Sequence, residues 1–257
     1  MAKCCCAIFE SKTKVMKQLQ IYVIWAGYSL GSLLVSLWLA WQLSAQLNFL
    51  YPLWYSVLNI DQTIEETMPK HLYKKEFIAT NTEEHHRLFE EIVSSVQSGG
   101  RGLAEIKFYT PDGNSLGALL TESEIIHLQD VAKLVDLLGW FALVLVIFCL
   151  MTMAAIIFFR LPMPAIKKLT LAVTLLIAMS VSIVLFVGAK KFFYWLHAVV
   201  FPSDHQWFFY YEESLMSTLM KAPDLFAPIS VMLLAVGLLI WLTHLVLLQL
   251  FAGFKTV

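Results

Sequence analysis

Charged residues are scarce in this sequence of 257 residues. Asp, Glu, Lys and Arg make up 14% of the chain, and 18 basic residues against 19 acidic ones give a formal net charge of -1. Hydrophobic residues make up 59%, and the mean hydropathy is +0.70. This composition excludes a soluble globular domain. The lack of a basic cluster also argues against a nucleic-acid partner, because binding to phosphates requires one.

Cysteines and nucleophile motifs are equally sparse. Of the four cysteines, Cys4, Cys5 and Cys6 are adjacent and lack a preceding apolar stretch typical of a lipoprotein signal, and Cys149 lies within an apolar run. We expect no disulfide framework. No serine has a G-x-S-x-G setting and no glycine-rich phosphate loop is present, so a covalent nucleophile has no support. An enzyme of this composition would rely on imidazoles, carboxylates and tyrosines in aromatic surroundings.

Long apolar runs are what the sequence has in abundance. Four of them are long enough to cross a bilayer as helices, at about 21–50, 137–159, 169–187 and 226–251. The first run is longer than the core of a signal peptide, so we take it as a retained anchor. We therefore expect an all-α membrane protein with four transmembrane helices, forming a single integral membrane domain over residues 1–257.

Basic residues mark the expected orientation of these helices. They precede the first run, occupy the short turn between the second and third, and follow the fourth, as Lys3, Lys12, Lys14, Lys17, Arg160, Lys167, Lys168 and Lys255. Since cytoplasmic loops are enriched in Lys and Arg, both termini should be cytoplasmic. Segments 51–136 and 188–225 should then face outward.

The first outward segment has the pattern of a small α+β cap. Asn81-Thr82-Glu83-Glu84 resembles a helix N-cap, apolar residues follow at helical spacing, and Gly99-Gly100 is typical of a helix end. Segments 105–109 and 115–120 are strand candidates on either side of Pro111-Asp112-Gly113-Asn114, whose residue types suit a hairpin turn. We expect an extracytoplasmic cap of this kind, inserted mainly between the first and second transmembrane helices.

The polar stretch before the second apolar run carries groups that transfer protons. Thr121 and Glu124 have the spacing of a capping box, which predicts that a helix begins here. On that helix Glu124, His127 and Asp130 follow one another at i, i+3 and lie along one side. A carboxylate beside an imidazole can hold the ring in one tautomer, so His127 oriented by Asp130 is a candidate general base. The alternative is that these residues only solvate the entry of the helix into the membrane.

A second histidine is expected near the first. The second and third apolar runs are joined by about ten residues and must be antiparallel neighbours. His127 precedes one run and His197 follows the other by a similar distance, roughly 15 Å each in a helix. A catalytic pair should lie within about 10 Å in an aromatic pocket. The alternatives are two unrelated residues of the interfacial aromatic belt, or a zinc site with Asp130, which no HExxH-type spacing or cysteine ligand supports.

Taken together, these elements resemble the lipoprotein intramolecular transacylase (Lit-type) family of integral membrane proteins, as a divergent member. The resemblance covers nearly the whole chain in element order. Its most specific part is the H-x-x-D-V element, followed by the second histidine. The residues that carry it are Tyr51-Pro52-Leu53-Trp54-Tyr55, Ser123-Glu124, His127-Leu128-Gln129-Asp130-Val131, Leu196-His197, Phe201-Pro202 and Trp207.

The resemblance implies an enzyme of the bacterial cytoplasmic membrane with its cap and active site on the outer face. Its substrate would be a diacylglyceryl lipoprotein in the bilayer, whose sn-2 acyl chain moves to the α-amine of its own N-terminal cysteine, without a cofactor or metal. By motif, the catalytic histidines are His127 and His197. From the residues themselves we expect His127, oriented by Asp130, to be the general base and His197 the general acid. The residues expected to enclose the substrate are Tyr51, Trp54, Tyr55, Glu124, Phe193, Trp195 and Trp207.

A non-catalytic polytopic membrane protein, whose cap mediates assembly or sensing, is the alternative interpretation of the same pattern. In that protein His127 and His197 would only pack. The sequence leaves the oligomeric state open in both cases.

Overall fold

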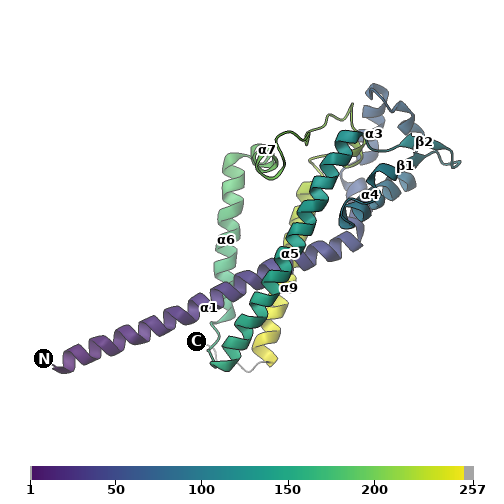
Figure 1. The fold of residues 1–257 in the computed structure, drawn as a ribbon. Helices are drawn as coiled ribbons and strands as arrows, with labels where there is room; N and C mark the ends of the chain where they lie inside the picture. The colour runs from purple at the N-terminus through teal and green to yellow at the C-terminus, as the bar shows by residue number, and fades with distance from the viewer. Residues whose placement is uncertain (1, 252–257) are drawn as a thin grey trace. The chain divides into compact units, whose positions relative to one another are not determined.

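Four long helices dominate the structure, a computed structural model that describes residues 2–251, with the side chains of residues 2–15 and of Ala189 excepted (Figure 1). They are α1 (Ala2–Gln46), α5 (Glu122–Phe158), α6 (Ile166–Val187) and α9 (Phe226–Phe251). Each has a segment long and apolar enough to cross a membrane, which confirms the predicted all-α membrane fold. The side chains of Cys4, Cys5 and Cys6 lie outside the described set.

Helix α1 ends at Gln46, before the predicted limit of the first run. Asn48, Phe49 and Leu50 follow with φ of 53°, 50° and 55°. Three consecutive non-glycine residues in this left-handed region cannot continue a right-handed helix. The chain therefore turns sharply here and starts the short helix α2 (Tyr51–Val57), which begins with the Tyr51-Pro52-Leu53-Trp54-Tyr55 stretch.

The chain forms two compact units. The first, here called the membrane unit, takes in the described parts of Met1–Leu39, Phe141–Phe186 and Val236–Val257. Its core includes Trp25, Ile156 and Trp241, all at most 2% exposed. Indole N–H groups form hydrogen bonds between separate elements of this unit. The indole of Trp25 donates to the Pro162 carbonyl at 2.9 Å, and the indole of Trp241 donates to the Ser29 carbonyl at 3.1 Å.

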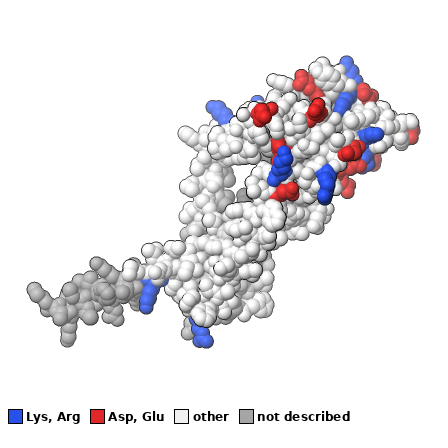
Figure 2. All heavy atoms as spheres, in the orientation of Figure 1, with Lys and Arg blue, Asp and Glu red and all other residues white. Residues whose placement is uncertain are grey.

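The second unit, here called the cap unit, comprises Ala40–Trp140 and Val187–Ala235. It takes in both segments expected to face outward. Its helices are the end of α1, α2, α3 (Ile60–Thr67), α4 (Thr82–Gln97), the start of α5, α7 (Ala189–Val200), α8 (Leu215–Leu219) and the start of α9. Charged side chains gather over this unit in Figure 2, whereas the membrane unit is nearly uncharged on the same face, as lipid-facing helices require.

The predicted hairpin is present but short. Strands β1 (Lys107–Tyr109) and β2 (Ser115–Ala118) pair antiparallel, with Phe108 opposite Gly117. Between them the amide of Gly113 donates to the Thr110 carbonyl at 2.9 Å, and Gly113 has a φ of 82° that suits glycine. This two-stranded sheet is the small β component expected in the cap.

Helix α4 forms as its sequence predicts. The Asn81 side chain accepts a hydrogen bond from the amide of Glu84 at 3.0 Å, which caps the helix. Its apolar face is buried at Leu88, Phe89 and Ile92. The Phe89 ring stacks on Tyr51, with centroids 3.9 Å apart and an interplanar angle of 6°. This stacking packs α4 against the start of α2.

His85 on α4 is a buried hydrogen-bonding hub. The Thr80 hydroxyl donates to the Phe77 carbonyl at 2.6 Å, so toward His85 Nε2, 2.7 Å away, it can only accept. Nε2 therefore carries the proton, and Nδ1 accepts from the Tyr55 hydroxyl at 2.8 Å. The ring is neutral in this arrangement, and burial lowers the pKa of His85 to about 4, with a smaller contribution from His86.

We therefore expect the cap to lose stability as the pH falls from about 6.5 to 4. Above pH 6.5 His85 is neutral both folded and unfolded; below it the unfolded chain takes up a proton that the folded state binds only near pH 4. The full loss is about 3 kcal/mol. Thermal unfolding of the detergent-purified protein, followed across this range, should show a smaller pH dependence for His85→Gln. Equal slopes for the two proteins would contradict this assignment.

Candidate active site

The predicted capping box sets the start of α5. The Glu124 carboxylate accepts hydrogen bonds from the amide and hydroxyl of Thr121 at 2.6 and 2.8 Å. Its other oxygen accepts from the Ser214 hydroxyl and from the Met216 amide at 3.3 Å. Glu124 is fully buried, so it joins the first turn of α5 to the segment that begins α8. His127 lies one turn further along α5.

His197 lies in the last turn of α7, and its own helix fixes its tautomer. Nδ1 is 2.9 Å from the carbonyl oxygen of Phe193, one turn back. A carbonyl can only accept, so Nδ1 carries the proton and Nε2 has a free lone pair. Burial lowers the pKa of His197, against the opposing effect of this hydrogen bond. The imidazole is therefore neutral near pH 7.

The two imidazoles are brought together as predicted. Their ring centroids are 6.4 Å apart and their planes differ by 29°. Phe201 contacts both, with centroid distances of 5.0 Å to His127 and 5.3 Å to His197. The ring centroids of Phe193 and Trp207 lie 3.9 and 5.1 Å from that of His197. The pair is thus enclosed by aromatic rings.

Both histidines line an apolar cavity of about 440 Å³ within the cap unit. One wall is the apolar face of α4, including Phe89, Ile92 and Val93, and another is the segment that includes Met216 and Ser217. The polar groups at its wall besides the histidines are few and uncharged. A cavity of this kind suits an aliphatic chain that meets the imidazoles at a polar end.

The residues predicted to enclose the substrate divide into two groups. Phe193 and Trp207 line the cavity. The others are not among its lining residues in the described part of the chain, and their hydrogen bonds and helix positions explain why. The Tyr51 hydroxyl donates to the Leu219 carbonyl at 2.6 Å, Tyr55 bonds His85, and the Trp54 indole donates to the Phe49 carbonyl at 3.0 Å.

Trp195 and Glu124 are held away from the cavity for different reasons. Trp195 is 58% exposed because it lies two residues before His197, on the opposite side of α7. Glu124 is fully buried, and both its oxygens are occupied by the capping and Ser214 hydrogen bonds. The structure thus gives Glu124 a supporting position behind His127 rather than a surface that a substrate could touch.

Asp130 interacts with partners other than the expected one. Its carboxylate oxygens accept from Lys133 Nζ at 3.0 Å and from the Nδ1 of His205. Among the described residues no hydrogen bond joins Asp130 to His127, so its effect on that ring is electrostatic and not orienting. The described part of the chain also contains no group of three or more His, Cys, Asp or Glu that could hold a metal ion.

Sequence reasoning missed much of the cavity wall. The ring centroids of Phe209 and His127 are 5.9 Å apart, and Met216, Ser217 and Met220 also line the cavity. The apolar face of α4 was recognisable from its spacing, but which element it faces was not. The signal for Phe209 was its place in an aromatic run, Trp207 to Tyr211, without a regular period.

Sequence comparison now decides the family. A family model described as Lipoprotein intramolecular transacylase Lit matches residues 27–222, which is well over half of the chain. The chain belongs to the Lit family. The match includes both histidines, and with the four apolar helices it makes this Lit family member a multi-pass integral membrane protein.

Solved structures share the fold. A structure of the membrane integral lipoprotein intramolecular transacylase Lit from Bacillus cereus, with one histidine replaced by arginine, gives a TM-score of 0.64 at 13% identity, covering 95% of this chain and 97% of that one. A second, with a histidine replaced by alanine, gives 0.60 at 14% identity, with coverages of 92% and 97%. A comparison of the sequence with curated proteins found no match. The resemblance to the Lit fold predicted from the sequence is confirmed.

We expect Glu124→Ala to destabilise this Lit family member by about 2 kcal/mol or more. The substitution removes the acceptor for Thr121, Ser214 and Met216 and leaves buried donors unpaired. Glu122→Ala is the matched control, since Glu122 lies in the same turn but is exposed and should change stability by about 0.5 kcal/mol or less. Thermal unfolding in detergent measures both. Equal losses would show that the Glu124 network does not support the fold.

Proposed function

We propose that this Lit family member moves the sn-2 acyl chain of a diacylglyceryl lipoprotein to the α-amine of the lipoprotein's own N-terminal cysteine. The observation that carries the proposal is the imidazole pair, His127 and His197, at the wall of an apolar cavity enclosed by aromatic rings. Family membership supplies the reaction class, lipoprotein intramolecular transacylation. The substrate brings both the nucleophile and the ester, so the protein needs neither a covalent nucleophile nor a cofactor.

The cavity favours transfer over hydrolysis. Apolar and aromatic walls keep water from the ester, while an amine held on the same molecule as the ester reacts at a high effective concentration. Phe193 and Trp207 are the residues we assign to enclosing the substrate around His197. Tyr51 and Trp54 support other parts of the cavity wall from behind, through the Phe89 ring and the Phe49 carbonyl, Tyr55 holds His85, and Trp195 is exposed on the far side of α7.

His197 is the residue we assign as general base. Its proton is held on Nδ1 by the Phe193 carbonyl, so the Nε2 lone pair is available to the substrate amine. A lowered pKa keeps this base in its neutral form at physiological pH. This assignment differs from the expectation from the sequence, in which His127 was the preferred general base and His197 the general acid.

His127 is assigned to stabilising the oxyanion. The amine nitrogen attacks the ester carbonyl carbon, and the amine proton moves to Nε2 of His197. The oxyanion of the tetrahedral intermediate accepts a hydrogen bond from an N–H group of the His127 imidazole. When the carbon–oxygen bond to glycerol breaks, His197 returns its proton to the departing oxygen. An amide and a free glyceryl hydroxyl result, and both imidazoles end unchanged.

The location of this activity follows from the same proposal. The basic residues that flank the apolar runs support an arrangement with both termini in the cytoplasm and the cap unit on the outer face of a bacterial cytoplasmic membrane. Lipid-anchored substrates would then reach the cavity from the bilayer. Asp130 supports the site from its pairing with His205 and Lys133 rather than by contact with the reacting groups.

Mass spectrometry of the N-terminal lipopeptide tests the proposal. A reporter lipoprotein is expressed in cells that lack their own N-acylation step. The cells also carry either the wild-type protein or the double variant with His127→Asn and His197→Asn. We expect a constant total acyl count with one chain moved from glycerol to the amine, seen only with the wild type. An unchanged lipopeptide in both cases would favour the non-catalytic membrane protein.

The roles of the two histidines predict different tolerance to glutamine, whose side-chain amide can donate a hydrogen bond but cannot act as a base. His127→Gln should keep measurable activity, whereas His127→Leu should lose about 10² to 10³ in rate. His197→Gln should lose about 10² to 10⁴, as His197→Leu does. Single-turnover rates with purified lipopeptide measure this. Retained activity in His197→Gln, with none in His127→Gln, would reverse the assignment.

A further inference from the structure

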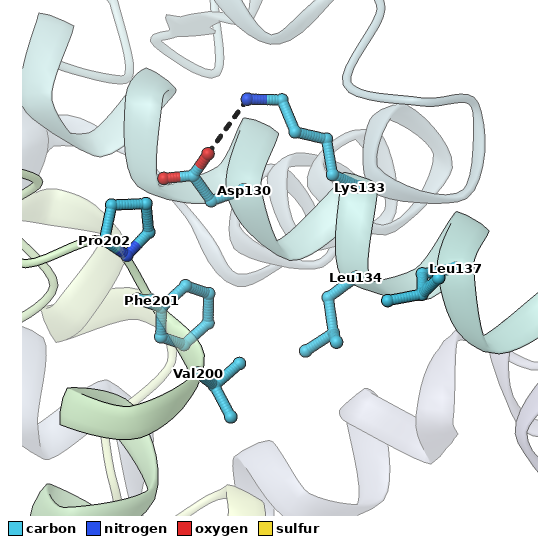
Figure 3. A pocket seen from close by; sticks show the side chains of 7 residues that line it. All are labelled: Asp130, Lys133, Leu134, Leu137, Val200, Phe201 and Pro202. Carbon is cyan, nitrogen blue, oxygen red and sulfur yellow. Dashed lines mark hydrogen bonds and ion pairs between the residues drawn. The ribbon is translucent and has the colours of Figure 1, made fainter.

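A second, smaller cavity adjoins the candidate active site. It has a volume of about 240 Å³, and it is a groove between α5 and the end of α7. Figure 3 shows the Asp130–Lys133 ion pair at one end and the side chains of Leu134, Leu137 and Val200 projecting into the open space at the other. The groove therefore changes from polar to apolar along α5.

The groove and the larger cavity share a wall. Leu134, Val200 and Phe201 line both, and Phe201 contacts both imidazoles. The two ester chains of a diacylglyceryl group diverge from neighbouring carbons of one glycerol. A substrate whose sn-2 ester meets the histidines must therefore place its other chain close to this wall.

We propose that the groove holds the acyl chain that stays on glycerol during the reaction. This inference rests on the proposed function, which supplies a substrate with two chains. It divides the substrate between two spaces, with the transferred chain in the larger cavity beside α4 and the retained chain between Leu134, Leu137 and Val200. Phe201 separates them and holds the glyceryl group at the imidazoles.

The walls of the groove favour a hydrocarbon chain over the peptide part of the lipoprotein. A peptide backbone would need hydrogen-bond partners for its amides and carbonyls. Leu134, Leu137, Val200 and Phe201 offer none from their side chains, and the Asp130 carboxylate is already bonded to Lys133 and His205. A hydrocarbon chain needs no such partners, and it gains from burial against these apolar side chains.

The direction of the chain follows from the polarity of α5. Lys133 is exposed at the polar end, and the apolar run that crosses the membrane begins at Leu137. The carbonyl end of the retained ester would lie toward the Asp130–Lys133 pair, and the methyl end toward Leu137. A lipid chain bound in this direction could enter from the bilayer without turning over.

Photo-crosslinking tests this placement without requiring turnover. A diacylglyceryl lipopeptide with a diazirine on the sn-1 chain is bound to His197→Asn, and the labelled residues are located by mass spectrometry. We expect labels on the peptides that carry Leu137 and Val200. The matched probe, with its diazirine on the sn-2 chain, should label Phe89 or Val93 on α4 instead. Equal labelling by both probes, or by a diazirine phospholipid that lipopeptide does not displace, would overturn the proposal.

A groove-filling variant gives a kinetic test. Leu137→Trp should raise KM about tenfold for a lipopeptide with a long sn-1 chain, the effect of losing the burial of roughly two CH₂ groups. It should leave KM unchanged for a short sn-1 chain. Leu138→Trp is the matched control, since Leu138 is an exposed neighbour that does not line the groove in the described chain. Equal effects on both substrates, or none on either, would contradict the assignment.

The outcomes separate the groove from the proposed function. Wild-type transfer on the short-chain lipopeptide reports the reaction, and its dependence on the sn-1 chain reports the groove. If no transfer occurs yet the sn-1 probe labels Leu137, the proposed function fails and the groove remains a lipid-chain site. If transfer occurs and the sn-1 probe labels α4, the groove assignment fails and the function stands.

Discussion

The buried carboxylate of Glu124 is the interaction on which the candidate site depends most. It accepts hydrogen bonds from Thr121 in its own first turn and, 90 residues further along the chain, from the Ser214 hydroxyl, as well as from the Met216 amide. His127 lies one turn along α5 from it, and Met216 lines the cavity that His127 faces. A buried carboxylate with every oxygen hydrogen-bonded fixes geometry in a way that apolar contacts alone do not, because removing any partner leaves an unpaired polar group.

A second polar contact acts on the segment after α7. Asp130 is 8% exposed and bonds His205, which belongs to the aromatic segment that supplies Phe201, Trp207 and Phe209 to the site. This pairing holds the segment against α5, while Glu124 holds α8. In both cases the charged group is not among the residues that line the larger cavity in the described chain, whereas the segments it holds supply apolar side chains to the cavity wall. The cavity remains apolar because its charged supports are satisfied behind its walls.

The sequence predicted well those structural elements whose signals lie in a few neighbouring residues. Four apolar runs, the Thr121–Glu124 capping box, the Asn81 cap and the turn at Gly113 each rest on a few neighbouring residues, and each is present. The proximity of His127 and His197 was predicted too, but the chain reaches it differently: α6 ends at Val187, Gly188 follows with a φ of 93°, and His197 lies on the separate helix α7. Glu124, Tyr51 and Tyr55 were harder to interpret. A buried residue and a substrate-facing one can have the same sequence pattern, and only their distant partners, Ser214, Leu219 and His85, distinguish them.

The tautomer of His197 is fixed without an acidic side chain. Each imidazole needs one nitrogen held so that the other has a defined role. For His197 the carbonyl of Phe193, one turn earlier in the same helix, does this. The carbonyl adds no net charge to the cavity, whereas a carboxylate beside the ring would favour the imidazolium and remove the free lone pair. A helix backbone therefore serves a neutral base in an apolar cavity better than an acidic side chain would, and Asp130 is left to hold His205 at the edge of the site.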